Sequence, residues 1–588
     1  MASGVETLLG CARLLRKNLV EPASLLALSR SRHLSYNPLY NYACSSWLWE
    51  EEETENLAPR SLGGVVVNDT FVDSFGGSCG SPSGSTSSFV AGIPLVVKDN
   101  IAVAGHVMQA ASAALRDSLC VADADAVASL RHNGARLVLR TNMDEFGFGS
   151  FGIHSPLYGT CRNARDATRV AGGSSSGSAT AVALGVVPAA LGTDTGGSVR
   201  LPACYQGIVG YRPSYGLVSR QGLVAYASSM DTAAVLARYT PDACAVLESM
   251  VHPVRDDDTA VLDAHRLVPP RLGALYCDAM AQAAAADDNN DDVDAHVAPL
   301  NGVRVAVLSR ECFPPNTSSA VCTAHERAAE VLRSLGAHVT DDVHLPLAHG
   351  HAAVSAYYAV AMAEAASNLA RYGAVPTRYG PPVGSLGALL GDEAVRRVLT
   401  GTALLGYGVA ADYRAVASSV RRAIAREYRA LFRGRCDGSE MFCPDVASAL
   451  GQHMQRLERA FEQEDAREST TAALSCTKSM LSSQPAHPQY HILLTPAAPT
   501  AAPTLEGAAA AAASSAVDST NMAFDADAFL AAPSLAGHPA VSVPAGVDAN
   551  EGSMPVGIQL VGDVGADVFL LGVASALSAR LLQRNVAL

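Results

Sequence analysis

Lysine is almost missing from this chain of 588 residues, which contains only Lys17, Lys98 and Lys478. Arginine supplies nearly all of the other basic charge. A buried lysine can lose its proton and act as a base, whereas arginine stays protonated in proteins. Lys98 directly follows the apolar residues Val96 and Val97, at the end of a short strand-like run. The composition therefore indicates that Lys98 has a role that arginine cannot fill.

Positive charge as a whole is also scarce, because 42 lysines and arginines stand against 56 aspartates and glutamates, for a formal net charge of −14. Nucleic-acid binders gather basic side chains against phosphates, so this balance argues against a general nucleic-acid binder and assigns any RNA contact to a partner. The ATP-binding motif G-x-x-x-x-G-K-[ST] is absent, because no lysine stands in such a motif. Long apolar stretches are all interrupted by glycine, proline or charge, so no membrane span is predicted.

Cysteine offers no sign of a metal site or a disulfide framework. The 13 cysteines are odd in number and scattered, and the closest-looking pairs, Cys312/Cys322 and Cys436/Cys443, lack the spacing of zinc ligands. Reduced thiols in an intracellular compartment are the simplest interpretation, and no metal is predicted.

Apolar and charged residues make up 49% and 17% of the chain, as in a globular protein with a sizeable core. Short apolar runs alternate with helical patterns, which predicts an α/β fold with a mixed central β-sheet covered by helices. The expected strands are at 95–97, 136–140 and 301–309 and in two C-terminal segments, and the expected helices include 123–131, 320–335 and 567–581.

We expect one domain over residues 1–588, with its catalytic core at about 89–247. Residues 278–297 and 507–516 are rich in alanine, the first with a run of acids, and are predicted to be low-complexity surface insertions. Residues 1–20 combine an apolar helical stripe with basic side chains. They are either an organelle transit peptide or the first helix of the enzyme.

Two glycine–serine clusters carry the main chemical signal. GGSSSGS contains Ser174 and TDTGGS contains Ser198, which is 24 positions further on. Glycines let backbone N–H groups point at one oxygen, so Thr195, Gly196 and Gly197 are candidates for an oxyanion hole beside a serine nucleophile. A phosphate-binding nest or a plain glycine turn would need only one such cluster, whereas the pair together with Lys98 favours catalysis.

A competing motif overlaps the first cluster. Residues 173–177 match G-x-S-x-G, the nucleophile elbow of α/β-hydrolases. That elbow needs a strand directly before it, and the preceding residues CRNARDATRVAG are polar and loop-like. The elbow is therefore disfavoured.

The blocks AGIPLVVKDN, TNMDEFGFGS, AGGSSSGSA, GTDTGGSVRLPA and PVGIQLVG together resemble the amidase signature family. The resemblance covers most of the chain and implies the amidase signature fold. It also implies that Ser198 is the nucleophile, that Ser174 is a bridging serine in a cis peptide, and that Lys98 is the base. A proton would then pass from Ser198 through Ser174 to Lys98.

Within this family, the segments at 356–373, 391–405 and 493–503 are similar to the glutaminase subunits of glutamyl-tRNA(Gln) amidotransferases. That similarity implies that Asp527 meets the ammonium of glutamine, that Arg397 or its neighbour Arg396 meets the carboxylate, and that Tyr357 and Ser150 line the pocket. The alternative for the two arginines is an exposed helix face.

The same similarity implies a complex with amidotransferase subunits B and C, or an equivalent small subunit. This chain would need no cofactor, while a partner protein would use ATP and Mg²⁺ and hold most of Glu-tRNA(Gln). A mitochondrion is the expected location, with a plastid or the cytoplasm as alternatives. Two other functions stay open: a free-standing amidase for a small, aryl or fatty amide, and a catalytically idle scaffold within the complex.

Overall fold

The computed structural model describes residues 7–46, 88–251, 272–285, 298–374, 386–406, 409–433, 489–513 and 522–583, with a few isolated positions between 262 and 475. Lys478, Cys436 and Cys443 lie outside the described residues.

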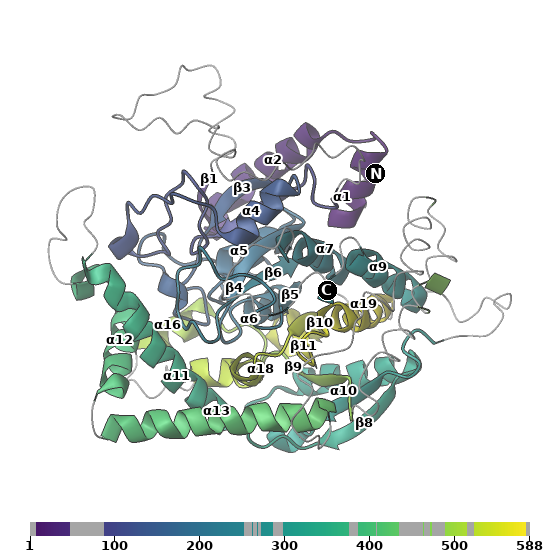
Figure 1. Cartoon of the computed structure of the whole chain (residues 1–588). Coiled ribbons are helices and arrows are strands. Elements are labelled where there is room, and N and C mark those ends of the chain that lie inside the picture. The colour runs from purple at the N-terminus through teal and green to yellow at the C-terminus, as the bar shows by residue number, and fades with distance from the viewer. Residues whose placement is uncertain are drawn as a thin grey trace.

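One sheet of 11 strands forms the centre of the molecule, in the order β1-β3-β2-β4-β6-β5-β10-β11-β9-β7-β8 (Figure 1). Its pairs are parallel within β3-β2-β4 and β9-β7-β8 and antiparallel elsewhere, so the predicted mixed sheet is confirmed. The strands are β1 (Ala43–Ser46), β2 (Pro94–Lys98), β3 (Arg136–Thr141), β4 (Ala189–Asp194), β5 (Val209–Arg212), β6 (Thr232–Ala237), β7 (Arg304–Leu308), β8 (His338–Val343), β9 (Ile492–Pro496), β10 (Ala540–Asp548) and β11 (Met554–Gly562).

Helices cover both faces of this sheet, because its central strands are apolar on both sides. Side chains alternate along a strand, and in β2 Leu95 and Val97 join one apolar cluster while Val96 joins another. The helices are α1 (Leu8–Arg16), α2 (Pro22–Tyr40), α4 (Asp125–His132), α5 (Ser176–Ala183), α6 (Arg200–Gln206), α7 (Thr240–Val251), α9 (Leu272–Ala285), α10 (Ser319–Ser334), α11 (His351–Leu369), α12 (Asp392–Leu405), α13 (Val409–Arg433), α16 (Leu505–Ala513), α18 (Ala531–Ala536) and α19 (Asp567–Gln583).

The long helices α11, α12 and α13 pack against one another beside the sheet, in the green part of Figure 1. The approach of α12 to α11 is close: a Cβ on Gly401 would lie 1.9 Å from the carbonyl oxygen of Met362. Only glycine fits at that crossing. This packing fixes the position of α12, and with it Arg397, relative to Tyr357 of α11.

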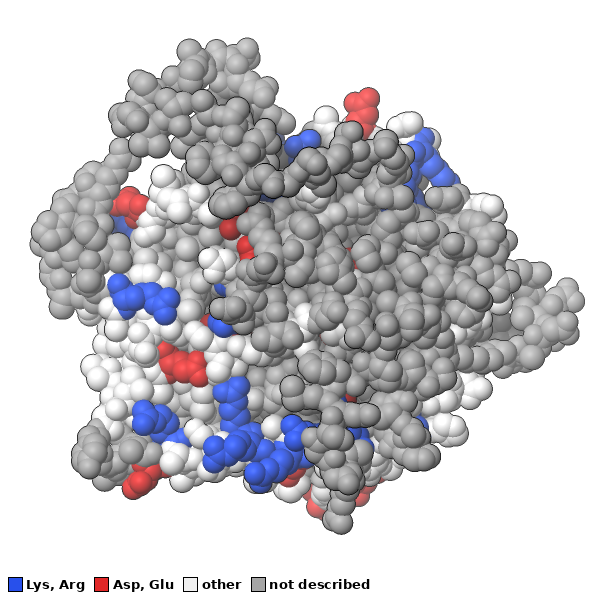
Figure 2. Space-filling model, in the orientation of Figure 1, with Lys and Arg blue, Asp and Glu red and all other residues white. Residues whose placement is uncertain are grey.

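Arginines line the exposed side of α13. Figure 2 shows basic side chains gathered on the lower part of the face where Figure 1 places this helix. The exposed arginines of α13 are Arg414, Arg422, Arg426 and Arg429. The acidic net charge is therefore not spread evenly over the surface.

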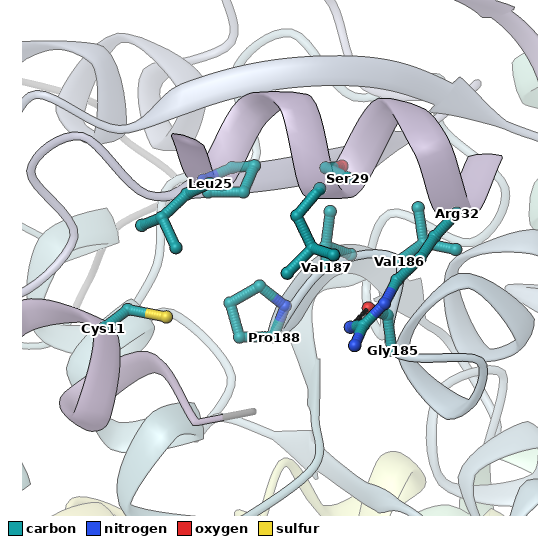
Figure 3. A pocket seen from close by; sticks show the side chains of 10 residues that line it. Cys11, Leu25, Ser29, Arg32, Gly185, Val186, Val187 and Pro188 are labelled. Atoms are coloured by element: carbon teal, nitrogen blue, oxygen red, sulfur yellow. Dashed lines mark hydrogen bonds between the residues drawn. The ribbon is translucent and has the colours of Figure 1, made fainter. Parts of the chain in front are cut away.

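The N-terminal helix α1 packs into the molecule. Thr7 caps it by accepting a hydrogen bond from the N–H of Gly10 at 2.8 Å, and Leu8, Leu9 and Ala12 are buried. Figure 3 shows α1, α2 and residues 185–188 closing around a crevice of about 20 Å³, room for about one water molecule. From residue 7 onward this segment thus forms a helix that contributes to the core.

The first of the two predicted insertions differs from expectation where it is described. Residues 278–285 form the end of α9, in which Met280 and Ala284 are buried against α19 and α7, so the prediction of a surface insertion is wrong for this part. The alanines pack because Asp278, the one acid among them, pairs with Arg13 at 2.7 Å. Residues 507–513 belong to α16, and residues 286–297 and 514–516 lie outside the described part.

Candidate active site

The two candidate catalytic clusters meet at one edge of the sheet. Lys98 ends β2 and Asp194 ends β4, and these two strands are parallel neighbours. The carboxyl ends of parallel strands lie at the same edge, where α/β proteins place their ligands. The loop that follows β4 carries Ser198, and the first turn of α5 follows Ser174.

Lys98 is fully buried and points at the first serine cluster. Its Nζ donates to Ser174 Oγ at 2.7 Å and to Thr193 Oγ1 at 3.0 Å. Burial lowers the pKa of Lys98 to about 7, although the charges of Asp144 and Asp194 act in the opposite direction. At neutral pH a large fraction of this lysine is therefore uncharged and able to accept a proton.

Ser174 is held by the backbone on both sides. The Gly173–Ser174 peptide bond is cis, as the resemblance implies. The N–H of Asp144 donates to the carbonyl of Ser174 at 3.3 Å. A Cβ on Gly173 would lie 2.0 Å from Asp144 Oδ2, so no larger residue fits there. The N–H of Ser175 donates to the carbonyl of Ser198 at 3.1 Å, which joins the two clusters directly.

Asp194 and two arginines brace the loop that carries Ser198. Asp194 accepts hydrogen bonds from Arg200 at 2.9 and 3.0 Å and from Arg212 at 3.2 Å, and all three side chains are buried. Burial alone would raise the pKa of Asp194, but the two guanidinium groups hold it below its usual range. The carboxylate thus stays charged and fixes the turn.

The oxyanion-hole prediction needs one correction. The N–H of Gly197 already donates to Asp194 Oδ1 at 3.0 Å, so it is not available to a substrate oxygen. Thr195 and Gly196 remain as candidates. Thr195 is fixed by a hydrogen bond from its Oγ1 to Asp231 at 2.7 Å. Gly196 lies against the ring of Tyr357, since a Cβ there would be 2.2 Å from the ring's Cζ.

Ser198 lies in the loop between β4 and α6 and is 8% exposed. Within the described residues its Oγ makes no hydrogen bond, so the link from Ser198 to Ser174 is not closed in this structure. Such contacts commonly tighten only when substrate binds.

Asp527 is buried beside Ser150 and Tyr358. It accepts hydrogen bonds from Ser150 Oγ at 3.2 Å and from the hydroxyl of Tyr358 at 2.8 Å. Burial raises the pKa of Asp527 to about 6, while these two donors and the charge of Arg397 act against the rise. Leu530, one turn further on, contacts the nucleophile loop, because a Cβ on Gly197 would lie 2.6 Å from its Cδ1. Asp527 and Ser198 therefore belong to one site.

Arg397 is buried, with 3% of its surface exposed, and interacts electrostatically with Asp527. Its Nε donates to Glu393 at 2.6 Å and its Nη1 donates to the hydroxyl of Tyr226 at 2.6 Å. Its guanidinium lies 5.2 Å from the ring centre of Tyr358, the residue that also contacts Asp527. The side chain of Arg396 is 38% exposed and binds Glu393 on the outside. Both arginines line the cavity beside Ser150, Arg397 with a buried side chain and Arg396 with a partly exposed one.

A cavity of about 1140 Å³ adjoins these side chains. Ser150, Glu393 and Arg397 line its inner part, and Ala508 and Ala511 of α16 line another wall. The alanine-rich segment at 507–513 thus contributes to the surroundings of the site.

Several site residues were not foreseen from the sequence: Thr193, Tyr226, Asp231, Tyr358 and Glu393. Tyr358 would have been the easiest of them to predict, because it directly follows the predicted Tyr357 and both side chains are buried. Glu393 stands four positions before Arg397, a spacing at which a carboxylate and a cation pair on one helix. No motif in the neighbouring sequence points to Tyr226 or Asp231, because a loop brings them to the site.

Fold and site together place the chain in the amidase family: the family's sequence model matches residues 79–457 and 440–571, and the chain belongs to this family. Its relatives include the A subunits of glutamyl-tRNA(Gln) amidotransferases. The chain is 35% identical over 535 residues to the mitochondrial one of Mycosarcoma maydis, covering 87% of this chain and 88% of that protein. It is 35% identical to the one of Symbiobacterium thermophilum, covering 83% and 82%.

Solved structures of related proteins share this fold. The crystal structure of the glutamyl-tRNA(Gln) amidotransferase A subunit from Thermotoga maritima matches with a TM-score of 0.62 and 27% identity, over 99% of this chain and 95% of that one. A 6-aminohexanoate cyclic dimer hydrolase, at 20% identity, shares the fold with a TM-score of 0.69 over 98% of this chain and 97% of that one.

The described residues contain no cluster of three potential metal ligands and no helix long and apolar enough to cross a membrane.

Proposed function

We propose that this chain is the glutaminase subunit of a glutamyl-tRNA(Gln) amidotransferase. It would release ammonia from glutamine for the conversion of Glu-tRNA(Gln) to Gln-tRNA(Gln). The observation that carries the proposal is a buried, hydrogen-bonded Lys98–Ser174 pair in a chain that also buries Asp527 and Arg397 around Tyr358. The similarity to the named glutamyl-tRNA(Gln) amidotransferase chains supports the same conclusion.

In the proposed mechanism Ser198 Oγ attacks the side-chain amide carbon of glutamine. Its proton passes to Ser174, whose own proton passes to Lys98 across the 2.7 Å hydrogen bond. Backbone N–H groups of Thr195 and Gly196 stabilise the oxyanion. The proton then returns to the leaving nitrogen as the C–N bond breaks, which releases ammonia and leaves an ester on Ser198. Water then attacks this ester while its proton passes through Ser174 to Lys98, and the proton returns to Ser198 Oγ as the ester bond breaks, which releases glutamate.

The pocket explains why glutamine fits better than a simple amide. Free glutamine carries an ammonium and a carboxylate, and burying either without a partner is costly. Asp527 supplies the negative charge and Arg397 the positive one, while Tyr358 contacts both. Ser150 and Tyr357 complete the walls. An aryl or fatty amide carries neither an ammonium for Asp527 nor a carboxylate for Arg397.

The remaining parts of the reaction are assigned to partners. Amidotransferase subunits B and C, or an equivalent small subunit, would complete the enzyme. One of them would use ATP and Mg²⁺ and hold most of Glu-tRNA(Gln). The mitochondrial relative from Mycosarcoma maydis supports a mitochondrial location, with a plastid or the cytoplasm as alternatives.

The isolated chain is expected to hydrolyse glutamine weakly, to hydrolyse no ATP and to bind tRNA poorly. Adding the partner subunits should stimulate glutamate release, because their surfaces close the site and the path of the ammonia. Glutamate release with and without partners, beside a panel of simple amides, tests this. Rapid turnover of an aryl or fatty amide without partners, and poor use of glutamine, would establish the free-standing amidase instead. A chain that hydrolyses no amide even in the complex would be the idle scaffold.

The rate at saturating glutamine is expected to fall as the pH drops below about 7, by about tenfold per unit, because protonated Lys98 cannot accept a proton. Glutamine must be saturating in this measurement. Protonation of Asp527, with its pKa near 6, weakens glutamine binding and raises the KM at lower pH values. The measurement is kcat and KM against pH. A kcat that stays flat down to about pH 5.5 would contradict the role of Lys98 as the base.

A further inference from the structure

A second cavity, of about 370 Å³, lies at the opposite edge of the sheet from Ser198. It is enclosed by α1, α7, α9 and α19, and Arg238 and Asp242 of the β6–α7 junction line it. The N–H of Arg238 donates to the carbonyl of Pro188, just before β4, whereas the active site follows the end of β4. β4 has 6 residues, so the cavity is roughly 17 Å away from the nucleophile loop.

Polar atoms without partners line this cavity. Thr240, Asp242 and Ser575 are each 1% exposed, yet Thr240 Oγ1, Asp242 Oδ2 and Ser575 Oγ make no hydrogen bond within the described residues. Asp242 uses only Oδ1, which accepts the N–H of Leu9 at the start of α1 at 3.1 Å. Buried polar atoms are normally paired, because water or a protein group otherwise satisfies them. Three such atoms around one cavity give it hydrogen-bonding groups that a polar ligand could use.

Two arginines that line this cavity have no carboxylate as an ion-pair partner within the described residues. Arg165 and Arg238 form no ion pair within the described residues, and burial together with the charge of Arg238 lowers the pKa of Arg165. Arg165 donates only to the carbonyl of Gln206, at 3.2 Å. Arg13, which also lines the cavity, is neutralised by Asp278 at 2.7 Å. Adjacent guanidinium groups without a counter-charge attract an anion, and they match a phosphate or a carboxylate geometrically.

We propose that this cavity binds a small metabolite whose anionic group, a phosphate or a carboxylate, lies at Arg165 and Arg238 and whose hydroxyl groups reach Asp242, Thr240 and Ser575. Its volume falls within the range of about 300–1000 Å³ that is usual for small-molecule sites. The rest of the lining is mostly apolar, which suits a compact carbon skeleton. The site is separate from the glutamine pocket and shares no lining residue with it.

Calorimetric titration of the full-length protein tests the proposal with two small probes that each carry an anionic group and at least one hydroxyl group. Ribose 5-phosphate carries a phosphate and L-malate carries carboxylates. Saturable binding of at least one probe is expected, and the better probe identifies the anionic group. The Ser198→Ala variant should bind equally well, because the nucleophile lies outside the cavity.

Two cavity variants and one control make the result specific. Arg238→Gln removes one anion contact, and Ala281→Phe fills the cavity without removing a polar group. Each should weaken binding by at least about tenfold. Arg136→Gln, an exposed arginine on β3, should change nothing. Failure of both probes to bind the wild-type protein would overturn the proposal. Binding that survives both cavity variants would also overturn it, by placing the probe elsewhere.

Discussion

The Ser198→Ala variant should lose at least about 10⁴-fold of its glutamine hydrolysis and form no acyl-enzyme, while its fold stays intact. Ser198 Oγ makes no hydrogen bond that the fold depends on, because none joins it to another described residue. The loop around it is held by Asp194, Arg200 and Arg212, which the substitution leaves in place. The measurements are steady-state glutamate release and mass spectrometry of protein trapped during turnover. Ser35→Ala, an exposed serine on α2, is the matched control and should behave like the wild type.

The Lys98→Arg variant is expected to lose about 10²–10⁴-fold, although it keeps the positive charge. An arginine at this position stays protonated and cannot accept the proton of Ser174, and its larger head must displace Thr193. Lys98→Ala should be impaired to a similar degree. Lys17→Arg, outside the site, is the control. A Lys98→Arg enzyme with near-normal glutaminase activity would show that the lysine is not the base.

Sequence alone singles out the candidate catalytic residues, because they are rare or lie in short local motifs. Ser174 and Ser198 lie in two short glycine–serine clusters, and Lys98 is one of three lysines. The strands that carry them are short apolar runs, and the structure places those runs at 94–98 and 189–194. The sequence does not show which acceptor each backbone N–H group of the loop donates to. Gly197 suits an oxyanion hole by residue type, but Asp194 engages its N–H, which depends on how the turn folds back.

The glutamine pocket is harder to predict because its members come from distant segments. Ser150 and Asp527 are 377 positions apart and meet only in the folded chain. Periodicity could not decide between Arg396 and Arg397, since neighbours on a helix point about 100° apart and either could face inward. The packing of α12 on α11 decides it, by burying Arg397 beside Tyr226.

Composition is misleading at 278–285, where alanines followed in the sequence by a run of acids suggest an exposed insertion. Small side chains are as suited to close helix packing as to solvent. The deciding contact is Asp278 with Arg13, 265 positions away, together with the burial of Met280 against the neighbouring helices. Such a tertiary pairing leaves no trace in a local window, so a low-complexity stretch needs the structure to be interpreted.

Arg397→Ala and Asp527→Asn should each raise the KM for glutamine by about 10–100-fold, because each removes the partner of one charge on the substrate. The control is Arg396→Ala. This neighbour binds the same Glu393 but stands on the exposed side, so its loss should leave KM nearly unchanged.

Ammonia separates a binding defect from a structural one. In the assembled complex, ammonium chloride bypasses glutamine, so both pocket variants should form Gln-tRNA(Gln) from ammonia at the wild-type rate while they fail with glutamine at low concentration. The pocket lies within this chain, and neither side chain takes part in the later steps of the proposed reaction. Equal losses with glutamine and with ammonia would therefore mean that the substitutions disturb folding or assembly, and the assignment of Asp527 and Arg397 to the ends of glutamine would have to be withdrawn.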